Sequence, residues 1–135
     1  MSELQQPRST IEHFLQLADT GKWEEFDEEV LKVCNDQQFI EWSTEEGLKD
    51  PRENARVLAI SIFEQTNQET LEPEQETSLR QSFLNDESLH LRRKAAFVLF
   101  KHGARDNEVI IRIKEARDND PELTETATKI LDKMK

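Results

Sequence analysis

The chain has 135 residues, of which 35% are charged and 35% are hydrophobic, so it is more polar than an average globular domain. Its 18 basic and 29 acidic residues give a net charge of −11, which disfavours nucleic acids and anionic membranes as partners because both attract positive surfaces. Residues 1–67 carry 6 basic and 15 acidic residues (net −9), whereas residues 68–135 carry 12 and 14 (net −2). Any basic patch is therefore expected in the second half of the chain.

The cysteine content and the hydropathy pattern bear on the compartment. A single cysteine, Cys34, excludes an internal disulfide and a zinc site built from several cysteines. It fits a reducing compartment. The N-terminal sequence has no apolar run typical of a signal peptide, and no apolar stretch is long enough to span a membrane. We therefore expect a cytoplasmic protein that does not bind membranes.

The first residues are predicted to precede a short helix. Apolar residues recur along the chain at spacings of three and four, which is typical of amphipathic helices, and no segment alternates as a strand does. We predict a flexible N-terminus over residues 1–8 and a first helix over about residues 10–20. Ser9 and Glu12 are expected to form a capping box at the start of this helix.

Three more helices are predicted up to the middle of the chain. The second covers about residues 22–35, so residues 9–36 form an N-terminal helix pair or a cap. The third covers about residues 37–46. The fourth is expected to have Asp50 as its N-cap and Pro51 in its first turn, where a missing N–H costs nothing.

Four helices are predicted in the second half. Pro73 opens the fifth, and the sixth runs over about residues 87–102 until Gly103 ends it. The seventh carries Val109, and the eighth begins near Pro121 and has one polar face, as expected of a terminal cap. The fourth and sixth helices are apolar nearly all round, which predicts that each packs against several neighbours.

The most informative feature is an internal repeat. The segment DPRENARVLAISIF from Asp50 matches DESLHLRRKAAFVL from Asp86 at an offset of 36, and a degenerate third copy begins at Asp118. Each copy places a small residue at an equivalent position, where helices can approach closely: Ala59, Ala95 and Ala127. Residues 37–135 are thus expected to form three stacked helix pairs.

The repeated pattern of an Asp, an Arg six residues later, a small pair and an aliphatic pair resembles HEAT repeats. The segment LHLRRKAAFVLFKHG (Leu89–Gly103) is most similar to the short HEAT-like repeats of the phycobilisome-lyase type. The resemblance implies a single all-α domain over residues 1–135. Its fold would be a right-handed α-solenoid of about eight helices in four antiparallel pairs. Members of this family include scaffolds, adaptors, chaperone-like assembly factors and chromophore-lyase subunits.

The resemblance also implies a role for the repeated charged residues, which are Asp50, Arg56, Asp86 and Arg92. In such repeats the Asp and Arg of successive units hold neighbouring units together. A charge-assisted bond from Asp86 to Arg92, or across to Arg56, is therefore favoured over contact with a ligand.

The sequence contains no recognisable catalytic, metal or cofactor motif, and none of these sites is predicted. The histidines, His13, His90 and His102, form no metal-ligand spacing. Glu24 with Glu28 and Glu25 with Glu29 lie at i, i+4; they are consistent with a cation or acid–base pair, but a solvated helix face is favoured.

One set of residues on the sixth helix is a candidate binding surface. Aligned as inner helices of a solenoid, the repeats place Arg93, Phe97, Phe100 and Lys101 on the concave face. Aromatic and basic side chains are typical of interface hot spots. The alternative is that Phe97 and Phe100 pack in the core, because a central helix is apolar all round.

These observations predict a non-enzymatic protein–protein interaction module, a scaffold or adaptor, with its partner on the concave surface. The alternative is a subunit similar to HEAT-like bilin lyases, which handles a chromophore or its apoprotein. The sequence does not define the oligomeric state or the partner.

Overall fold

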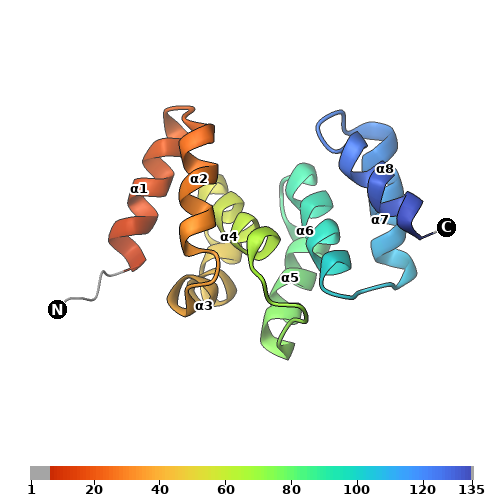
Figure 1. Ribbon diagram of the computed structural model, residues 1–135, viewed down its shortest axis with the longest axis horizontal. Helices are drawn as coiled ribbons and strands as arrows, with labels where there is room; N and C mark the ends of the chain where they lie inside the picture. The colour runs from red at the N-terminus through yellow and green to blue at the C-terminus, as the bar shows by residue number, and fades with distance from the viewer. Residues whose placement is uncertain (1–6, 135) are drawn as a thin grey trace. The chain divides into compact units, whose positions relative to one another are not determined.

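The computed structural model describes the backbone of residues 7–134 and the side chains of residues 10–134 (Figure 1). Within that range the chain forms eight α-helices and one short 3-10 helix and no strand, so the all-α prediction is confirmed. The elements are α1 (Pro7–Asp19), α2 (Trp23–Val33), α3 (Gln37–Glu45), η1 (Gly47–Lys49), α4 (Glu53–Gln65), α5 (Pro73–Asn85), α6 (Leu89–Lys101), α7 (Asn107–Asn119) and α8 (Thr124–Lys133).

The helices fall into two compact units. The N-terminal unit contains α1 to α4 and ends at Gln68, and the C-terminal unit contains α5 to α8 and begins at Glu69. The N-terminal unit therefore carries most of the net negative charge, which is −9 over residues 1–67. The prediction that residues 1–135 form one domain stays a prediction. No helix in the described range is both long enough and apolar enough to cross a membrane.

The N-terminal unit is built around α4, which contacts α1, α2, α3 and η1. Its core contains an aromatic cluster in which the Phe14 ring lies edge-on to Phe26 at 5.5 Å and to Phe39 at 6.3 Å between centroids. These edge-to-face contacts add to the stabilisation from apolar burial. The helix pair α1–α2 thus shares one core with α3 and α4.

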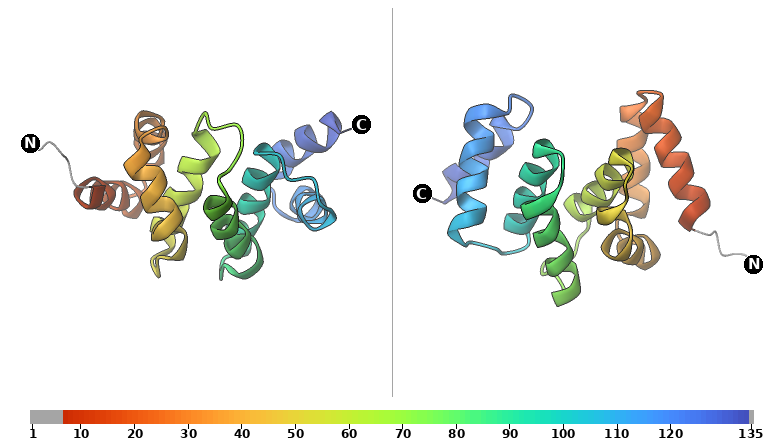
Figure 2. Two further views of the ribbon diagram at one scale, coloured as in Figure 1. Left: turned by 90° about the horizontal axis from the view of Figure 1, so that it is seen from below. Right: turned by 180° about the vertical axis from the view of Figure 1, so that it is seen from behind.

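The C-terminal unit is a succession of contacting neighbours: α5 with α6, α6 with α7, and α7 with α8. The pair α5 and α6 lies side by side in both views of Figure 2. Ala95 on α6 and Ala127 on α8 are completely buried, as is Ala59 on α4 in the other unit. The predicted positions of close approach are therefore core positions, because a small side chain lets neighbouring helix backbones come near.

The start of α4 differs from the prediction that Pro51 occupies its first turn. The helix begins at Glu53 with Arg52 as N-cap. The Asp50 carboxylate accepts a hydrogen bond from the Arg52 backbone N–H at 2.8 Å, which holds residues 50–52 in a turn ahead of the helix. Asp50 therefore stabilises the preceding turn and is not the N-cap.

The start of α1 also differs from the prediction. The helix begins at Pro7, a residue suited to the first helical position, so Ser9 lies inside the helix and is not an N-cap. Of the predicted flexible N-terminus, residues 1–6 lie outside the described residues, and Pro7 and Arg8 belong to α1.

The boundaries in the second half are largely as predicted. Pro73 is the first residue of α5, and the Glu72 backbone N–H donates to Gln75 Oε1 at 2.9 Å. Gly103 follows α6 with φ of 112°, a conformation that suits glycine after a helix. The eighth helix begins at Thr124, three residues after the predicted Pro121.

Candidate functional site

The structure buries two of the four residues predicted to bind a partner. Phe97 is 5% exposed and Arg93 is 8% exposed. The Arg93 guanidinium donates from Nε and Nη2 to Glu115 Oε1 on α7, both at 3.3 Å. Its Nη1 lies 3.5 Å from Asp120 Oδ2. Arg93 is thus engaged in holding α6 to α7 and to the turn before α8.

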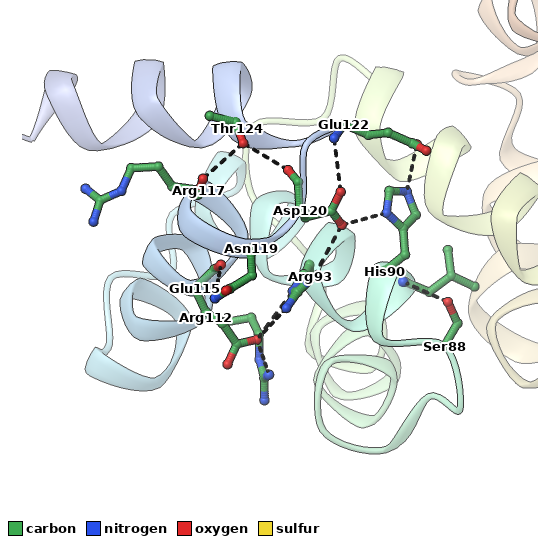
Figure 3. A network of polar contacts seen from close by, with 11 residues as sticks. Ser88, His90, Arg93, Arg112, Glu115, Arg117, Asn119, Asp120, Glu122 and Thr124 are labelled. Carbon is green, nitrogen blue, oxygen red and sulfur yellow. Dashed lines mark hydrogen bonds and ion pairs between the residues drawn. The ribbon is translucent and has the colours of Figure 1, made fainter.

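These contacts belong to a polar network of the C-terminal unit (Figure 3). His90 Nδ1 lies 2.9 Å from the same Asp120 Oδ2, and His90 Nε2 lies 4.0 Å from Glu122 Oε2. The other Asp120 oxygen accepts a hydrogen bond from the Glu122 backbone N–H at 3.2 Å. On α7, Arg112 Nη1 donates to Glu115 Oε1 at 2.8 Å.

The network lowers the pKa values of its two central carboxylic acids. For Asp120, burial alone would raise the pKa, but the hydrogen bonds from His90, from the Glu122 backbone and from Arg93 outweigh burial and leave it below its usual value. For Glu115, burial also acts to raise the pKa, and the bonds from Arg112 and Arg93 outweigh it. Both side chains are therefore ionised in the folded protein at neutral pH.

The chemical capacity of the network is limited by these bonds. For covalent catalysis, a His–Asp pair needs a serine hydroxyl or a cysteine thiol within reach of the imidazole. Ser88, two residues from His90, accepts a hydrogen bond from the Leu91 backbone N–H at 3.2 Å and serves as N-cap of α6. The polar network joins α6, α7 and the turn before α8, which fits a structural role. Among the residues whose side chains are described, no group of three or more metal-binding side chains comes together.

The other two predicted partner-binding residues lie at the end of α6. Phe100 is half-buried and Lys101 is exposed. The guanidinium of exposed Arg105 stacks over the Phe100 ring, 3.7 Å from its centroid. Arg105 Nη1 also donates to the backbone carbonyl oxygens of Phe100 and Ala104, at 2.6 Å and 3.0 Å. We call Phe100, Lys101 and Arg105 the α6 corner.

Of the four residues predicted to hold repeats together, Arg56 and Asp86 make hydrogen bonds within their own turns. Arg56 Nη1 donates to the carbonyl oxygens of Asp50 and Pro51 at 2.9 Å and 3.1 Å. The Asp86 carboxylate accepts from the Ser88 backbone N–H at 2.8 Å. Arg92 Nε is buried with no hydrogen-bond partner among the described residues. The role of these residues between successive repeats stays a prediction.

An aspartate turn recurs before four helices, α3, α4, α6 and α8. In each turn an aspartate oxygen accepts a hydrogen bond from the backbone N–H two residues later, at 2.8 to 3.2 Å. The aspartates are Asp36, Asp50, Asp86 and Asp120. Before α8 the turn is formed by Asp120, two residues after Asp118, which matches Asp50 and Asp86 in the sequence alignment. Asp118 pairs with neighbouring Arg117 at 2.9 Å.

Sequence reasoning missed three features of the site. It treated His90 as an isolated residue, it did not single out Glu115, and it did not include Arg105 in the binding surface. The pairing of His90 with Asp120 crosses 30 positions of sequence, and no local pattern signals it. Arg105 lay within reach of sequence reasoning, because a basic residue shortly after a helix often contacts its last carbonyl groups.

Comparisons with known proteins add no relative. No protein-family model matches the chain, and neither a curated protein nor a solved structure matches it. The resemblance to HEAT repeats accordingly rests on the internal repeat itself.

Proposed function

We propose that this chain is a non-enzymatic protein–protein interaction module, a scaffold or adaptor, that binds an acidic segment of a partner protein at the α6 corner. The observation that carries the proposal is the stacking of Arg105 on Phe100, 3.7 Å from the ring centroid. The stack offers a flat aromatic and cationic surface beside exposed Lys101.

The composition of the α6 corner suits protein recognition. Arginine and aromatic side chains are enriched at interface hot spots. Stacking on Phe100 and two bonds to backbone carbonyl oxygens restrict the Arg105 guanidinium, so less conformational entropy is lost when it binds a carboxylate. The positive charges favour an acidic partner segment, which would bring an apolar side chain to the exposed part of Phe100.

The buried residues of α6 take a supporting role in this proposal. Arg93 is bonded to Glu115 and Asp120, and Phe97 is in the core, so both fix the position of α6. The predicted contact surface is therefore reduced to Phe100 and Lys101 and extended to Arg105.

A HEAT-like architecture is part of this proposal, and two features of the structure support it. The recurrent aspartate turns before α4, α6 and α8 and the fully buried Ala59, Ala95 and Ala127 are what a repeated helix pair would provide. We infer a right-handed α-solenoid of four antiparallel pairs whose inner helices are α4, α6 and α8. A cytoplasmic location is part of this proposal.

The test is affinity capture from native host lysate followed by mass spectrometry, with four baits. We expect one protein to be retained stoichiometrically by the wild type, and lost with Arg105→Glu and Phe100→Ala. Lys114→Glu, a reversal of an exposed positive charge on α7, is the matched control and should retain it. In the purified complex, Arg105→Glu should weaken the affinity at least about 10-fold.

Circular dichroism and thermal unfolding of the four baits serve as the folding control. A lost partner is informative only if the variant is folded as well as the wild type. Retention of the same partner by Arg105→Glu and Phe100→Ala would contradict the α6 corner as the binding site. The alternative function, handling of a chromophore, predicts a different result: increased or red-shifted absorbance when a linear tetrapyrrole is titrated into the purified protein.

A further inference from the structure

A second surface of interest lies on the outer face of α2, in the N-terminal unit. Positions i, i+1, i+4, i+5 and i+8 of a helix form one continuous face. On α2 these are all exposed, and we call them the α2 stripe: Trp23, Glu24, Asp27, Glu28 and Leu31. Two large apolar side chains thus stand at the ends of the face, about 12 Å apart along the axis at a rise of 1.5 Å per residue.

Trp23 is exposed and yet held in place. Its side chain is 42% exposed, while its ring lies edge-on to Phe26 with centroids 5.1 Å apart. Phe26 is buried and packs in turn against Phe14 in the core. No group among the described residues accepts a hydrogen bond from the Trp23 indole N–H. A fixed aromatic ring with a donor at its edge loses little conformational entropy on binding, as interface anchors do.

Leu31 is an apolar residue in an acidic setting. It is 61% exposed, and on the helix it neighbours Glu28 at i−3, Asp27 at i−4 and Glu24 at i−7. The side of α2 that packs in the core is formed by buried Phe26 and Val30, and Leu31 is not part of it. Leu31 therefore contributes little to the folding of this unit and keeps its apolar surface available.

Among the described residues the carboxylates of the stripe are only weakly compensated, by an electrostatic interaction of Lys32 with Glu28. Lys32 pairs with Glu29, at 2.9 Å, on the flank of the stripe. In the described part of the chain no ion pair involves Glu24, Asp27 or Glu28. The first 67 residues carry a net charge of −9, so the field around the stripe is negative.

We propose that the α2 stripe binds a basic segment of a partner protein that carries at least two apolar side chains. Lysine or arginine of the segment pairs with the three carboxylates, and its apolar side chains cover Trp23 and Leu31. Charge complementarity selects this occupant. A second copy of the chain, with a net charge of −11, is repelled, as are nucleic acids and anionic membranes.

The experiment is selection of binders from a random peptide library displayed on a surface, with the full chain as bait. We expect enriched peptides with net positive charge and at least two aliphatic or aromatic residues. Binding of a synthetic selected peptide should weaken at least about 10-fold when salt is raised from 50 to 500 mM, because screening reduces the attraction between charges. It should also protect Trp23 from quenching by acrylamide.

Variants with matched controls locate the site. Glu24→Lys with Glu28→Lys should weaken peptide binding at least about 10-fold. Glu41→Lys with Glu45→Lys makes the same charge change on an exposed i, i+4 pair of α3 and should alter it by less than about 3-fold. Leu31→Glu should abolish binding, whereas Leu84→Glu, at an exposed leucine of α5, should not.

The outcomes separate this proposal from the α6 corner. The absence of basic peptides among those enriched, or basic peptides that bind the wild type and the α2 variants equally, overturns the α2 stripe. Acidic peptides lost with Arg105→Glu would at the same time support the proposed function. A library that yields no peptide binder overturns the α2 stripe, while the proposed function is still decided by its own capture experiment.

Discussion

His90 on α6 is bound to Asp120 in the turn before α8, with 2.9 Å between Nδ1 and Oδ2 (Figure 3). The same carboxylate oxygen faces the Arg93 guanidinium, and the other oxygen accepts a backbone N–H of its own turn. One aspartate thus defines a turn and ties it to a neighbouring helix. The stability of the C-terminal unit should depend on this residue.

Asp120→Asn is expected to destabilise the protein by about 1–3 kcal/mol, because Arg93 and His90 lose their charged acceptor while the amide oxygen still closes the turn. Urea unfolding followed by circular dichroism measures the change. Asp118→Asn, which removes an exposed carboxylate paired with neighbouring Arg117, is the control and should leave the free energy of unfolding nearly unchanged. Equal effects of the two substitutions would contradict a special role for Asp120.

Stability should fall in acid through the same network. The pKa values of Asp120 and Glu115 are lower in the folded protein than their usual values. The unfolded chain therefore takes up protons first, and the stabilisation, complete above the unfolded pKa of about 4, is lost as pH falls through the folded pKa. The free energy of unfolding measured from pH 6 down to pH 2 should decline below about pH 4. The decline should be shallower in Asp120→Asn; an unchanged slope would contradict the assignment.

Gly47 is needed for the close approach of η1 to α3 and α4. A Cβ added there would lie 2.7 Å from the Trp42 ring and 2.9 Å from the Ala59 Cβ. Gly47→Ala should therefore destabilise the protein by about 1–3 kcal/mol, since a packed core resists overfilling. The same substitution combined with Trp42→Leu should cost less than the sum of the two, because the smaller side chain leaves room. Thermal unfolding of the four proteins measures this coupling, and strict additivity would contradict it.

Cys34 is expected to react slowly in the native protein. The thiol is buried, and its Sγ lies 3.6 Å from the Leu31 carbonyl oxygen. Its reaction with a thiol-specific reagent should be on the order of 100-fold slower than in urea, because the reagent must wait for local opening. Absorbance of the released chromophore measures both rates. Equal rates would show that the end of α2 opens freely in solution.

Much of the secondary structure could be predicted from the sequence, because it depends on local spacing. Pro73 and Gly103 marked a helix start and a helix end through their own backbone preferences. The start of α4 was misplaced by two residues. A side-chain bond from Asp50 to the Arg52 backbone competes with capping, and residue preferences alone do not decide between them.

The candidate site was less accessible to sequence reasoning. Alignment of the repeats as inner helices of a solenoid placed Arg93 and Phe100 on the same expected concave face. Only the packing of α7 and of the turn before α8 against α6 buries Arg93 and supplies Glu115 and Asp120 as its partners. For the α2 stripe the sequence supplied the acidic face, while the exposure of Trp23 and Leu31 required the structure.

By itself, the sequence determined that this chain is helical and that negative charge concentrates in its first half. It also determined that small residues such as Ala95 lie in the core. These properties depend on residue type and on a period of three to four residues. The tertiary structure alone decided which polar side chains meet, as His90 and Asp120 do across 30 positions. That outcome depends on the relative rotation and height of packed helices, which the sequence pattern of a single helix does not contain.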